Sequence, residues 1–501
     1  MRWVSLAIEL LRTHPVPVFW AATLSQAVLW TLVPSLFYSA PPGGLAEFLA
    51  VARDFSLGYP SGPPLALWLA EVAFQTGGMP AVYLLSQICV GVTYWSVFSL
   101  GRIVVGDRHA AMAVMLMAGV AVFSVPSPEF GPPILAMALW SLVLLHVWRA
   151  AGQGRRLHWL AVGLETGLLL LTSYSGFALV GLLIVFLAMT RRGREQFKSF
   201  EPLAGAAVAL LVFFPHLVWI EQNAALDRLR VAGASQIVDS LWNWGSTLAL
   251  LAAGHGGLLI LLLLGRGITF GRRGAAAEIV RPPVDADARL YVLFFALAPI
   301  FAVAAMTIFA EGPDGFLPPA LAVLSALAVI VMAPDRIRIV HQRLVQYVWA
   351  ALLLLPPAMV ALAVTFLPWM FGTELRIAQP AAEMGRFFAE SFERRFARPL
   401  EIVTGDPHTA ALVALYAPSR PRLHALIAPE LSPRATRQDI ETKGAIVVWR
   451  ATSTRGLPPP AIQERLPGIV PEVPRAFERR FQGRLPLVRI GWSAIRPAAP
   501  R

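Results

Sequence analysis

The sequence predicts a polytopic α-helical membrane protein that ends in a small α/β domain. Of its 501 residues, 56% are hydrophobic and only 14% are charged, whereas soluble domains carry about 25% charged residues. The apolar residues gather in runs of about 17 to 25, which is the length an α-helix needs to cross roughly 30 Å of hydrocarbon. After residue 373 the long runs stop, and short β-branched segments alternate with helical patterns.

About eleven segments are expected to be transmembrane helices. They are residues 15–38, 80–101, 109–125, 132–148, 157–172, 175–190, 203–221, 244–265, 290–309, 316–333 and 345–370. The two segments within 157–190 are short enough to be tilted or partly re-entrant helices instead. The first run exceeds the apolar core of a signal peptide and lacks a small-residue cleavage site, so we expect it to remain as the first span.

The distribution of basic residues predicts the orientation, because cytoplasmic loops retain Lys and Arg. One set of loops holds Arg2, Arg12, Arg102, Arg108, Arg149, Arg155, Arg156, Arg191, Arg192, Arg194, Lys198, Arg266, Arg272, Arg273, Arg281, Arg289, Arg336, Arg338 and Arg343, which is 19 residues. The opposite loops hold only Arg53, Arg228 and Arg230. The N-terminus is therefore expected in the cytoplasm, with residues 374–501 on the opposite, periplasmic face of a bacterial inner membrane.

The formal net charge of +12 does not indicate nucleic-acid binding. Its arginines lie mainly in short loops between apolar runs and form no basic stripe. Membrane lipids are expected partners of the spans, and for the basic C-terminal domain a solvated surface is favoured over attraction to anionic headgroups. Cys89 is the single cysteine and lies inside an apolar run, which excludes an intrachain disulfide.

The first outer loop, residues 39–79, contains two amphipathic helical patterns, 44–57 and 65–75. The glycines and prolines of residues 58–64 separate them. Residues 1–373 are thus expected to form the transmembrane domain with this outer loop. In the C-terminal domain, 374–501, a helical pattern over 377–396 precedes apolar or β-branched runs at 400–404, 411–416, 423–427, 444–449 and 486–492.

Several separated motifs resemble those of the GT-C glycosyltransferases of the protein-mannosyltransferase and aminoarabinose-transferase type (glycosyltransferase family 39). They are Leu57-Gly58-Tyr59 with Pro63-Pro64-Leu65, Ser127-Pro128-Glu129, Leu171-Thr172-Ser173-Tyr174, Pro215-His216-Leu217-Val218-Trp219 with Gln222-Asn223, residues 428–433, residues 444–449, and Ile490-Gly491-Trp492. Each motif is short, but their order follows that of the family. The resemblance implies transfer of a sugar from a polyprenyl-phosphate donor to a lipid or glycan acceptor.

The chain departs from this family where the family's chemistry is expected. Aligned on residues 57–59, the acidic pair of the family's first outer loop falls on Gly44 and Leu45, neither of which takes up a proton. Its acidic and basic residues before the paired prolines fall on Ser61 and Gly62, and its lysine in the Leu171–Tyr174 motif falls on Ser173. The resemblance therefore leaves open whether catalysis is retained.

The residues that remain supply two candidate bases and four candidate phosphate ligands. Glu47, one turn after the missing pair, and Glu129 are the candidate catalytic carboxylates, and the alternative for each is a solvated charge. Arg53, Tyr59, Tyr174 and His216 are the candidate ligands of the donor phosphate. Interfacial anchoring is the alternative for Arg53, as it is for the two tyrosines and the histidine. A divalent metal ion would be another way to hold the phosphate, and no motif identifies one.

Two other functions stay open. A degenerate member of the fold would bind a lipid or a partner without transferring sugar. A transporter would need a polar pathway at mid-membrane, for which Glu165 is the main hint, while Glu71 and Glu221 fit membrane interfaces.

Overall fold

The computed structural model describes residues 9–223, 245, 248–266, 277–309, 319–339, 341–426, 435–451 and 456–498. The chain divides into two compact units. Unit 1 comprises residues 1–31, 62–66 and 83–357, and unit 2 comprises residues 32–61, 67–82 and 358–501. The C-terminal domain therefore folds into one unit with most of the first outer loop.

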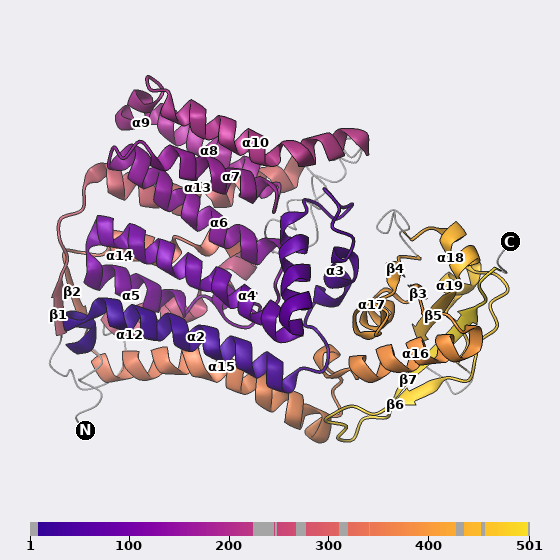
Figure 1. Cartoon of the computed structure of the whole chain (residues 1–501). Helices are drawn as coiled ribbons and strands as arrows, with labels where there is room; N and C mark the ends of the chain where they lie inside the picture. The colour runs from indigo at the N-terminus through magenta and orange to yellow at the C-terminus, as the bar shows by residue number, and fades with distance from the viewer. Residues whose placement is uncertain are drawn as a thin grey trace. The chain divides into compact units, whose positions relative to one another are not determined.

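Helices dominate the first 370 residues (Figure 1). In chain order they are α2 (Pro15–Phe37), α3 (Leu45–Ala52), α4 (Leu65–Val105), α5 (Asp107–Met117), α6 (Pro132–Val147), α7 (His158–Leu170), α8 (Ser175–Met189), α9 (Arg191–Gln196), α10 (Glu201–Gln222), α12 (Gly256–Arg266), α13 (Ala286–Phe309), α14 (Ser325–Met332) and α15 (Gln342–Met370). A π-helical turn, Trp148–Gly152, continues α6. Two short strands, β1 (Ala277–Val280) and β2 (Arg336–Ile339), pair antiparallel.

Among the described residues, five helices are long and apolar enough to cross a membrane, or six if one bent pair counts as a single span. The five are Pro15–Phe37, Leu65–Val105, Pro132–Gly152, Glu201–Gln222 and Gln342–Met370, and the bent pair is Leu248–Gly254 with Gly256–Gly265. The shorter apolar helices His158–Leu170, Ser175–Met189 and Ala320–Met332 coincide with other predicted spans. The membrane-type helical architecture matches the prediction, whereas the count of eleven is not confirmed.

Two predicted segments differ from the observed helices. The segment 109–125 is α-helical only to Met117, and Gly119 then lies against α12, where its carbonyl accepts a hydrogen bond from Leu258 N at 3.0 Å. A Cβ on Gly119 would lie 2.5 Å from Leu258 N, so this contact requires glycine. The outer-loop helix predicted over 44–57 ends at Ala52.

Glycines set the packing of α7 against α10 within unit 1. A Cβ on Gly163 would lie 2.1 Å from Gly205 O, and one on Gly205 would lie 2.4 Å from Trp159 O. The two helix backbones therefore approach as closely as in small-residue packing of membrane helices. Figure 1 shows α7 running alongside α10.

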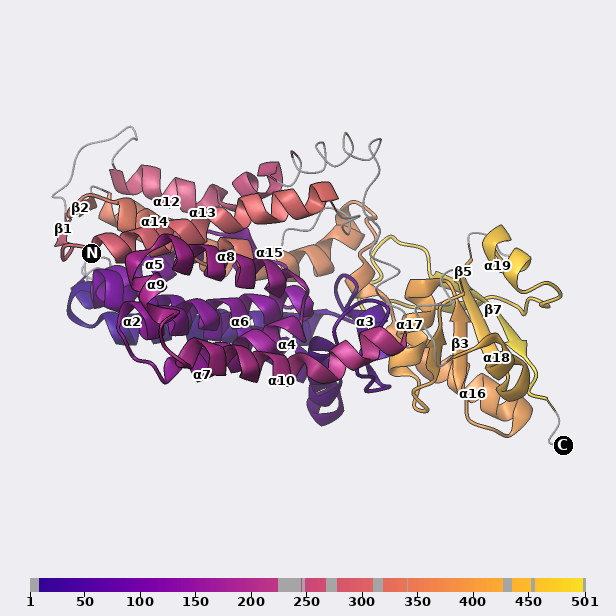
Figure 2. The ribbon, with the colours of Figure 1, turned by 90° about the horizontal axis from the view of Figure 1, so that it is seen from above.

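Unit 2 contains a mixed five-stranded sheet of order β4-β3-β5-β7-β6. Figure 2 shows strands β3, β5 and β7 of this sheet. Its strands are β3 (Ile402–Gly405), β4 (Arg422–His424), β5 (Ala445–Arg450), β6 (Arg475–Phe477) and β7 (Val488–Ile495). β3 is parallel to β4 and β5, and β7 is antiparallel to β5 and β6. The helices are α16 (Ala381–Phe396), α17 (Pro407–Tyr416), α18 (Arg437–Lys443) and α19 (Pro460–Arg465).

Alternating residues of the sheet face two hydrophobic cores. Val403 and Val448 pack with Phe388 and Phe392 of α16 and with α17, while Trp449 packs on the other face with residues of and beside α19. The apolar run at 411–416 belongs to α17 and not to a strand, because Asp406 and Pro407 start a helix there. The Asp406 carboxylate accepts from Thr409 N, and proline is favourable in the first turn.

Helix α3 also belongs to the core of unit 2. Ala46 and Ala50 are buried in the cluster that contains α16 and α17. Two ion pairs reinforce this packing, Arg422 Nε to Asp54 at 3.2 Å and Arg420 to Glu71 at 2.9 Å. The outer loop and the C-terminal domain are thus held together by apolar contacts and by paired charges.

Candidate functional site

Helix α3 positions Glu47 and buries Leu45. Leu45 and Leu49 are 1% and 0% exposed, so the position of the second family carboxylate is occupied by a core side chain. Gly44 is the N-cap residue at φ −92° and ψ 10°, and a Cβ there would meet no atom within 4 Å. Glu47 lies in the first turn of α3, which favours a negative charge.

The Glu47 carboxylate pairs with a histidine of the C-terminal domain. Its Oε1 lies 2.8 Å from His408 Nδ1, and the two side chains are 34% and 15% exposed. Because a carboxylate only accepts hydrogen bonds, we assign the proton to Nδ1, which leaves His408 Nε2 as the acceptor nitrogen. Among the described residues, neither His408 Nε2 nor Glu47 Oε2 has a hydrogen-bond partner, although both atoms are buried.

The start of α17 fixes His408 beside Glu47. Asp406 N donates to Val448 O of β5 at 2.8 Å, and the Asp406 carboxylate accepts from Thr409 N at 3.0 Å and Thr409 Oγ1 at 2.6 Å. His408 lies between these anchored residues, in the first turn of the helix. The sequence analysis did not single out His408, since only the fold brings residues 47 and 408 together.

Arg53 and Tyr59 both lie in unit 2, where Arg53 is exposed and Tyr59 is buried. Arg53 directly follows α3, is exposed, and pairs with no carboxylate among the residues that the structure describes. Tyr59 is 4% exposed and packs against Ala52 and Leu67. Its hydroxyl accepts from Ser56 N at 3.0 Å and donates to Ala52 O at 3.5 Å. Arg53 is therefore available to a ligand, while Tyr59 fixes the turn after α3.

Three of the family-like motifs meet in unit 1. Leu65 N donates to Leu171 O at 2.9 Å, and Leu65 and Leu171 pack with Phe213 of α10. Tyr174 Oη lies 3.0 Å from His216 Nε2, with the two rings stacked at 5.9 Å. The candidates Tyr174 and His216 thus form one hydrogen-bonded pair.

Glu129 lies in a tight loop that side chains of α4 hold by hydrogen bonds. Gln87 Nε2 donates to Ser127 Oγ at 3.1 Å, and Ser86 donates to the Ser127 carbonyl. Glu129 itself is half-buried, and its backbone N donates to Pro126 O at 3.0 Å. The loop is rigidly held, as a site for a carboxylate requires.

Two of the three acidic residues predicted in or near the spans, Glu71 and Glu165, have specific partners. Glu71 is 1% exposed and accepts from Arg420 through both oxygens, at 3.1 and 2.9 Å. Glu165 Oε1 accepts from His146 Nδ1 at 2.6 Å, and Arg149 lies 3.3 Å from the other nitrogen of that histidine. Glu165 is thus linked through His146 to Arg149, which lies in the π-helical turn after α6. Glu221 is exposed at the end of α10.

Metal ligands do not gather in the described part of the chain. No group of three His, Cys, Asp or Glu side chains lies close enough there to hold an ion. The described residues therefore do not fit a metal site, and the proposed chemistry uses the side chains alone.

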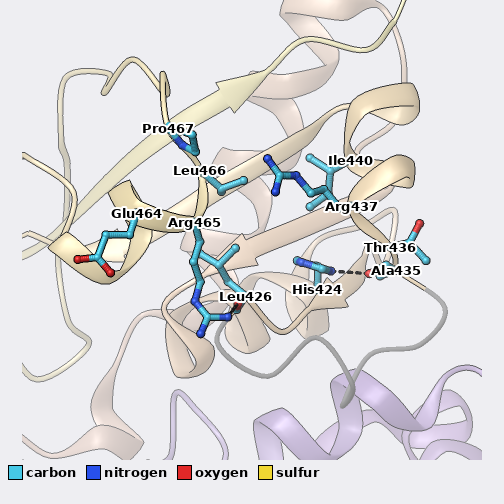
Figure 3. Close-up of a pocket in the computed structure, with 10 residues that line it drawn as sticks. All are labelled: His424, Leu426, Ala435, Thr436, Arg437, Ile440, Glu464, Arg465, Leu466 and Pro467. Carbon is cyan, nitrogen blue, oxygen red and sulfur yellow. Dashed lines mark hydrogen bonds between the residues drawn. The ribbon is translucent and has the colours of Figure 1, made fainter.

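A separate cavity of about 520 Å³ lies within the C-terminal domain (Figure 3). Two of its basic side chains are engaged by backbone oxygens: Arg465 donates to Leu426 O at 2.7 Å, and His424 Nδ1 bonds to Ala435 O. A third, Arg437, pairs with Glu441 at 3.8 Å. None of the candidate catalytic or phosphate-binding residues from the sequence analysis lines this cavity. The family-like segment 428–433 lies outside the described residues.

Two other C-terminal motifs are neighbours in the sheet. β5, which holds residues 445–450, pairs with β7 so that Trp449 lies opposite Gly491. A Cβ on Gly491 would lie 2.2 Å from Trp449 Nε1, so the glycine makes room for the indole ring.

The fold is that of the GT-C membrane glycosyltransferases. The structure of ArnT from Cupriavidus metallidurans bound to undecaprenyl phosphate is similar over 97% of this chain and 99% of that one, with 15% sequence identity and a TM-score of 0.60. The apo structure of the same protein gives 15% identity, the same coverage and a TM-score of 0.58. The predicted membrane protein with a small C-terminal domain is therefore confirmed.

The sequence itself matches a family model over residues 61–219, and that family is described as dolichyl-phosphate-mannose-protein mannosyltransferase. This range contains the motifs that meet in unit 1. No curated protein matches the chain.

Proposed function

We propose that the protein transfers a sugar from a polyprenyl-phosphate donor to a hydroxyl of a lipid or glycan acceptor. The observation that carries this proposal is a GT-C fold matching, end to end, a structure whose bound molecule is undecaprenyl phosphate. The family model over residues 61–219 supports the same chemistry. The proposed orientation, with the N-terminus cytoplasmic and residues 374–501 periplasmic, rests on the distribution of basic residues.

The proposed base is the Glu47–His408 pair. His408 Nε2 takes the proton of the acceptor hydroxyl, and Glu47 holds the opposite nitrogen protonated and stabilises the imidazolium that forms. The acceptor oxygen then bonds to the anomeric carbon of the sugar. The bond from that carbon to the phosphate oxygen breaks, and its electron pair leaves with the polyprenyl phosphate.

Arg53 is the proposed ligand of the departing phosphate. Its guanidinium is exposed and follows the helix that carries Glu47. A guanidinium binds phosphate oxygens in a bidentate manner and stays charged throughout the reaction. Within unit 1, the Tyr174–His216 pair and Glu129 remain separate proposed contacts for phosphate or hydroxyl groups.

A transfer assay in detergent with labelled undecaprenyl-phosphate sugars and a total membrane lipid extract tests the proposal. Glu47→Gln and His408→Gln are expected to lower kcat by about 10²- to 10⁴-fold, the usual worth of a general base. Arg53→Gln is expected to raise KM for the donor by about tenfold, since it removes charge-assisted hydrogen bonds. Glu383→Gln, at an exposed position of α16, is the matched control.

The outcomes separate the base assignment from the function. If Glu129→Gln abolishes transfer and His408→Gln leaves it intact, the assigned base is wrong while the function stands. If no donor is turned over by the wild-type protein, the degenerate alternative replaces the proposed function. The neutral residues at 44, 45, 62 and 173 favour that alternative.

A further inference from the structure

Three arginines gather around one cavity in unit 1, and none of the three is assigned to sugar transfer. The cavity measures about 290 Å³ and is lined by Ser99, Arg102, Ile103, Asp107, Arg149, Gln153 and Arg155. These residues come from the end of α4, the start of α5, the π-helical turn after α6, and the loop that follows it. We call this the arginine pocket.

The arginine pocket has an excess of positive charge. Its one carboxylate, Asp107, is already paired with Arg102 at 2.9 Å. Arg149 lies 3.3 Å from His146, whose other nitrogen is hydrogen-bonded to Glu165. Arg155 is exposed and pairs with no carboxylate among the described residues. The orientation of the protein requires only that arginines be frequent in the loops on one side of the membrane. It does not explain why three of them surround one cavity.

The local structure fixes two of the pocket's arginine side chains in place. Arg149 lies in the π-helical turn Trp148–Gly152, and such turns are frequent at functional sites. Arg149 lies over the Trp95 ring at 6.0 Å, and Arg102 lies over the Phe98 ring at 5.6 Å. Both guanidinium groups are thus oriented by aromatic rings of α4.

One apolar side chain lines the pocket, and exposed leucines follow it closely along the chain. Ile103 in the pocket wall is 36% exposed, and Leu157, two residues after Arg155, is 82% exposed. Leu160 of α7 is 45% exposed. A ligand with a phosphate and an acyl chain would satisfy both surfaces.

We propose that the arginine pocket binds the phosphate of an anionic glycerophospholipid. The phosphate lies between Arg149 and Arg155 and takes hydrogen bonds from their free N–H groups, while the acyl chains run along the exposed leucines. Basic pockets between helix ends are known to hold such headgroups. This lipid is distinct from the sugar donor, so the proposal is independent of the proposed function.

Native mass spectrometry of the full-length protein tests this site, with phosphatidylglycerol, phosphatidylcholine and inorganic phosphate as the three probes. The pocket variant is Arg149→Gln with Arg155→Gln, and the control is Arg156→Gln with Arg191→Gln, two arginines outside the pocket whose side chains are 68% and 90% exposed. The pocket variant is expected to bind phosphatidylglycerol about 25-fold more weakly, roughly fivefold for each arginine. The control should change by less than twofold, and phosphatidylcholine should not compete.

Two results would overturn the proposal. Equal losses in the pocket and control variants would mean that the lipid responds to net charge alone. Inorganic phosphate binding as tightly as phosphatidylglycerol would mean that the site takes free phosphate. If the double variant does not fold, Arg155→Gln alone decides, because that side chain supports no ion pair within the described residues.

Discussion

The positions where the family's polar residues are missing differ in burial and in backbone conformation. Leu45 is buried in the core of unit 2, whereas Gly44 faces open space at the start of the same helix. Gly62 has a φ of +136°, a conformation that L side chains rarely adopt, so the basic residue expected there from the family could not be accommodated without strain. At Gly44, in contrast to Gly62, a side chain can be added without backbone strain.

We predict that Gly44→Asp is tolerated and increases transfer. The backbone at 44 is accessible to L residues, a new side chain meets no atom within 4 Å, and Asp is a favourable N-cap for α3. The free energy of unfolding should change by less than about 0.5 kcal/mol. The transfer assay gives the functional result, and Gly44→Asn is the control that caps the helix without supplying a base. Equal rates for the two variants would contradict a catalytic role for this carboxylate.

The buried ion pair between Glu71 and Arg420 is expected to stabilise unit 2. The Glu71 side chain is 2% exposed and Arg420 is 22% exposed, with the guanidinium 4.6 Å from the Phe74 ring centroid. Glu71→Gln is expected to lower the free energy of unfolding by about 3 kcal/mol, because a buried pair that loses one partner leaves the other charge uncompensated. Denaturant unfolding in detergent measures this loss. Glu390→Gln, at an exposed site, serves as the control, and a loss no larger than the control's would show that the pair contributes nothing.

Among the elements, the α7–α10 pair depends most directly on residue size. Leucine and valine dominate these helices, yet their contact is made by Gly163, Gly205 and Gly167. A Cβ at Gly167 would lie 2.7 Å from Val212 Cβ. Without a hydrophobic force between helices in lipid, close backbone contact is what holds such a pair together.

We expect Gly163→Val to separate α7 from α10. The added side chain meets backbone of α10, which cannot rotate away, so the apparent Tm in detergent should fall by several degrees. Gly181→Val is the matched control, because a Cβ on this glycine of α8 meets no atom within 4 Å. An equal effect of both substitutions would attribute the loss to valine itself and not to helix contact.

At the scale of the whole molecule, Glu374 joins separate parts of unit 2 near the end of α15. It accepts hydrogen bonds from Arg450 and from Arg479, the latter at 2.8 Å, and Arg479 is 3% exposed. Burial raises the pKa of Glu374, but the hydrogen bonds and charges of the two arginines outweigh it and lower that pKa below its usual value. The carboxylate is therefore more stable in the folded protein than in the unfolded chain.

This pKa shift predicts a pH-dependent contribution to stability. The contribution is complete above the unfolded pKa of about 4.3 and is lost as the pH falls through the lowered folded value. Glu374→Gln should thus cost about 2 kcal/mol at pH 7, and the difference from wild type should disappear in strong acid. Thermal unfolding from pH 7 to pH 3 measures it, with Glu383→Gln as the control. A difference that stays constant with pH would mean that packing, and not ionisation, is responsible.

The sequence by itself determined the membrane class, the positions of most long helices, the C-terminal α/β domain and the family resemblance. Those features follow from hydrophobic run length, from periodicity and from short motifs, which are local properties of the chain. The apolar run 411–416 was ambiguous because periodicity does not separate a short buried strand from a buried helix, and only the Asp406 cap decides it.

Only the tertiary structure decided which polar groups act together. It paired Glu47 with His408, Glu71 with Arg420 and Tyr174 with His216, and it gathered Arg102, Arg149 and Arg155 around one cavity. The physical reason is that hydrogen bonds and ion pairs act over a few ångströms, while these partners are separated by many residues along the chain. Their pairing depends on how the helices pack, which no local pattern of residues specifies.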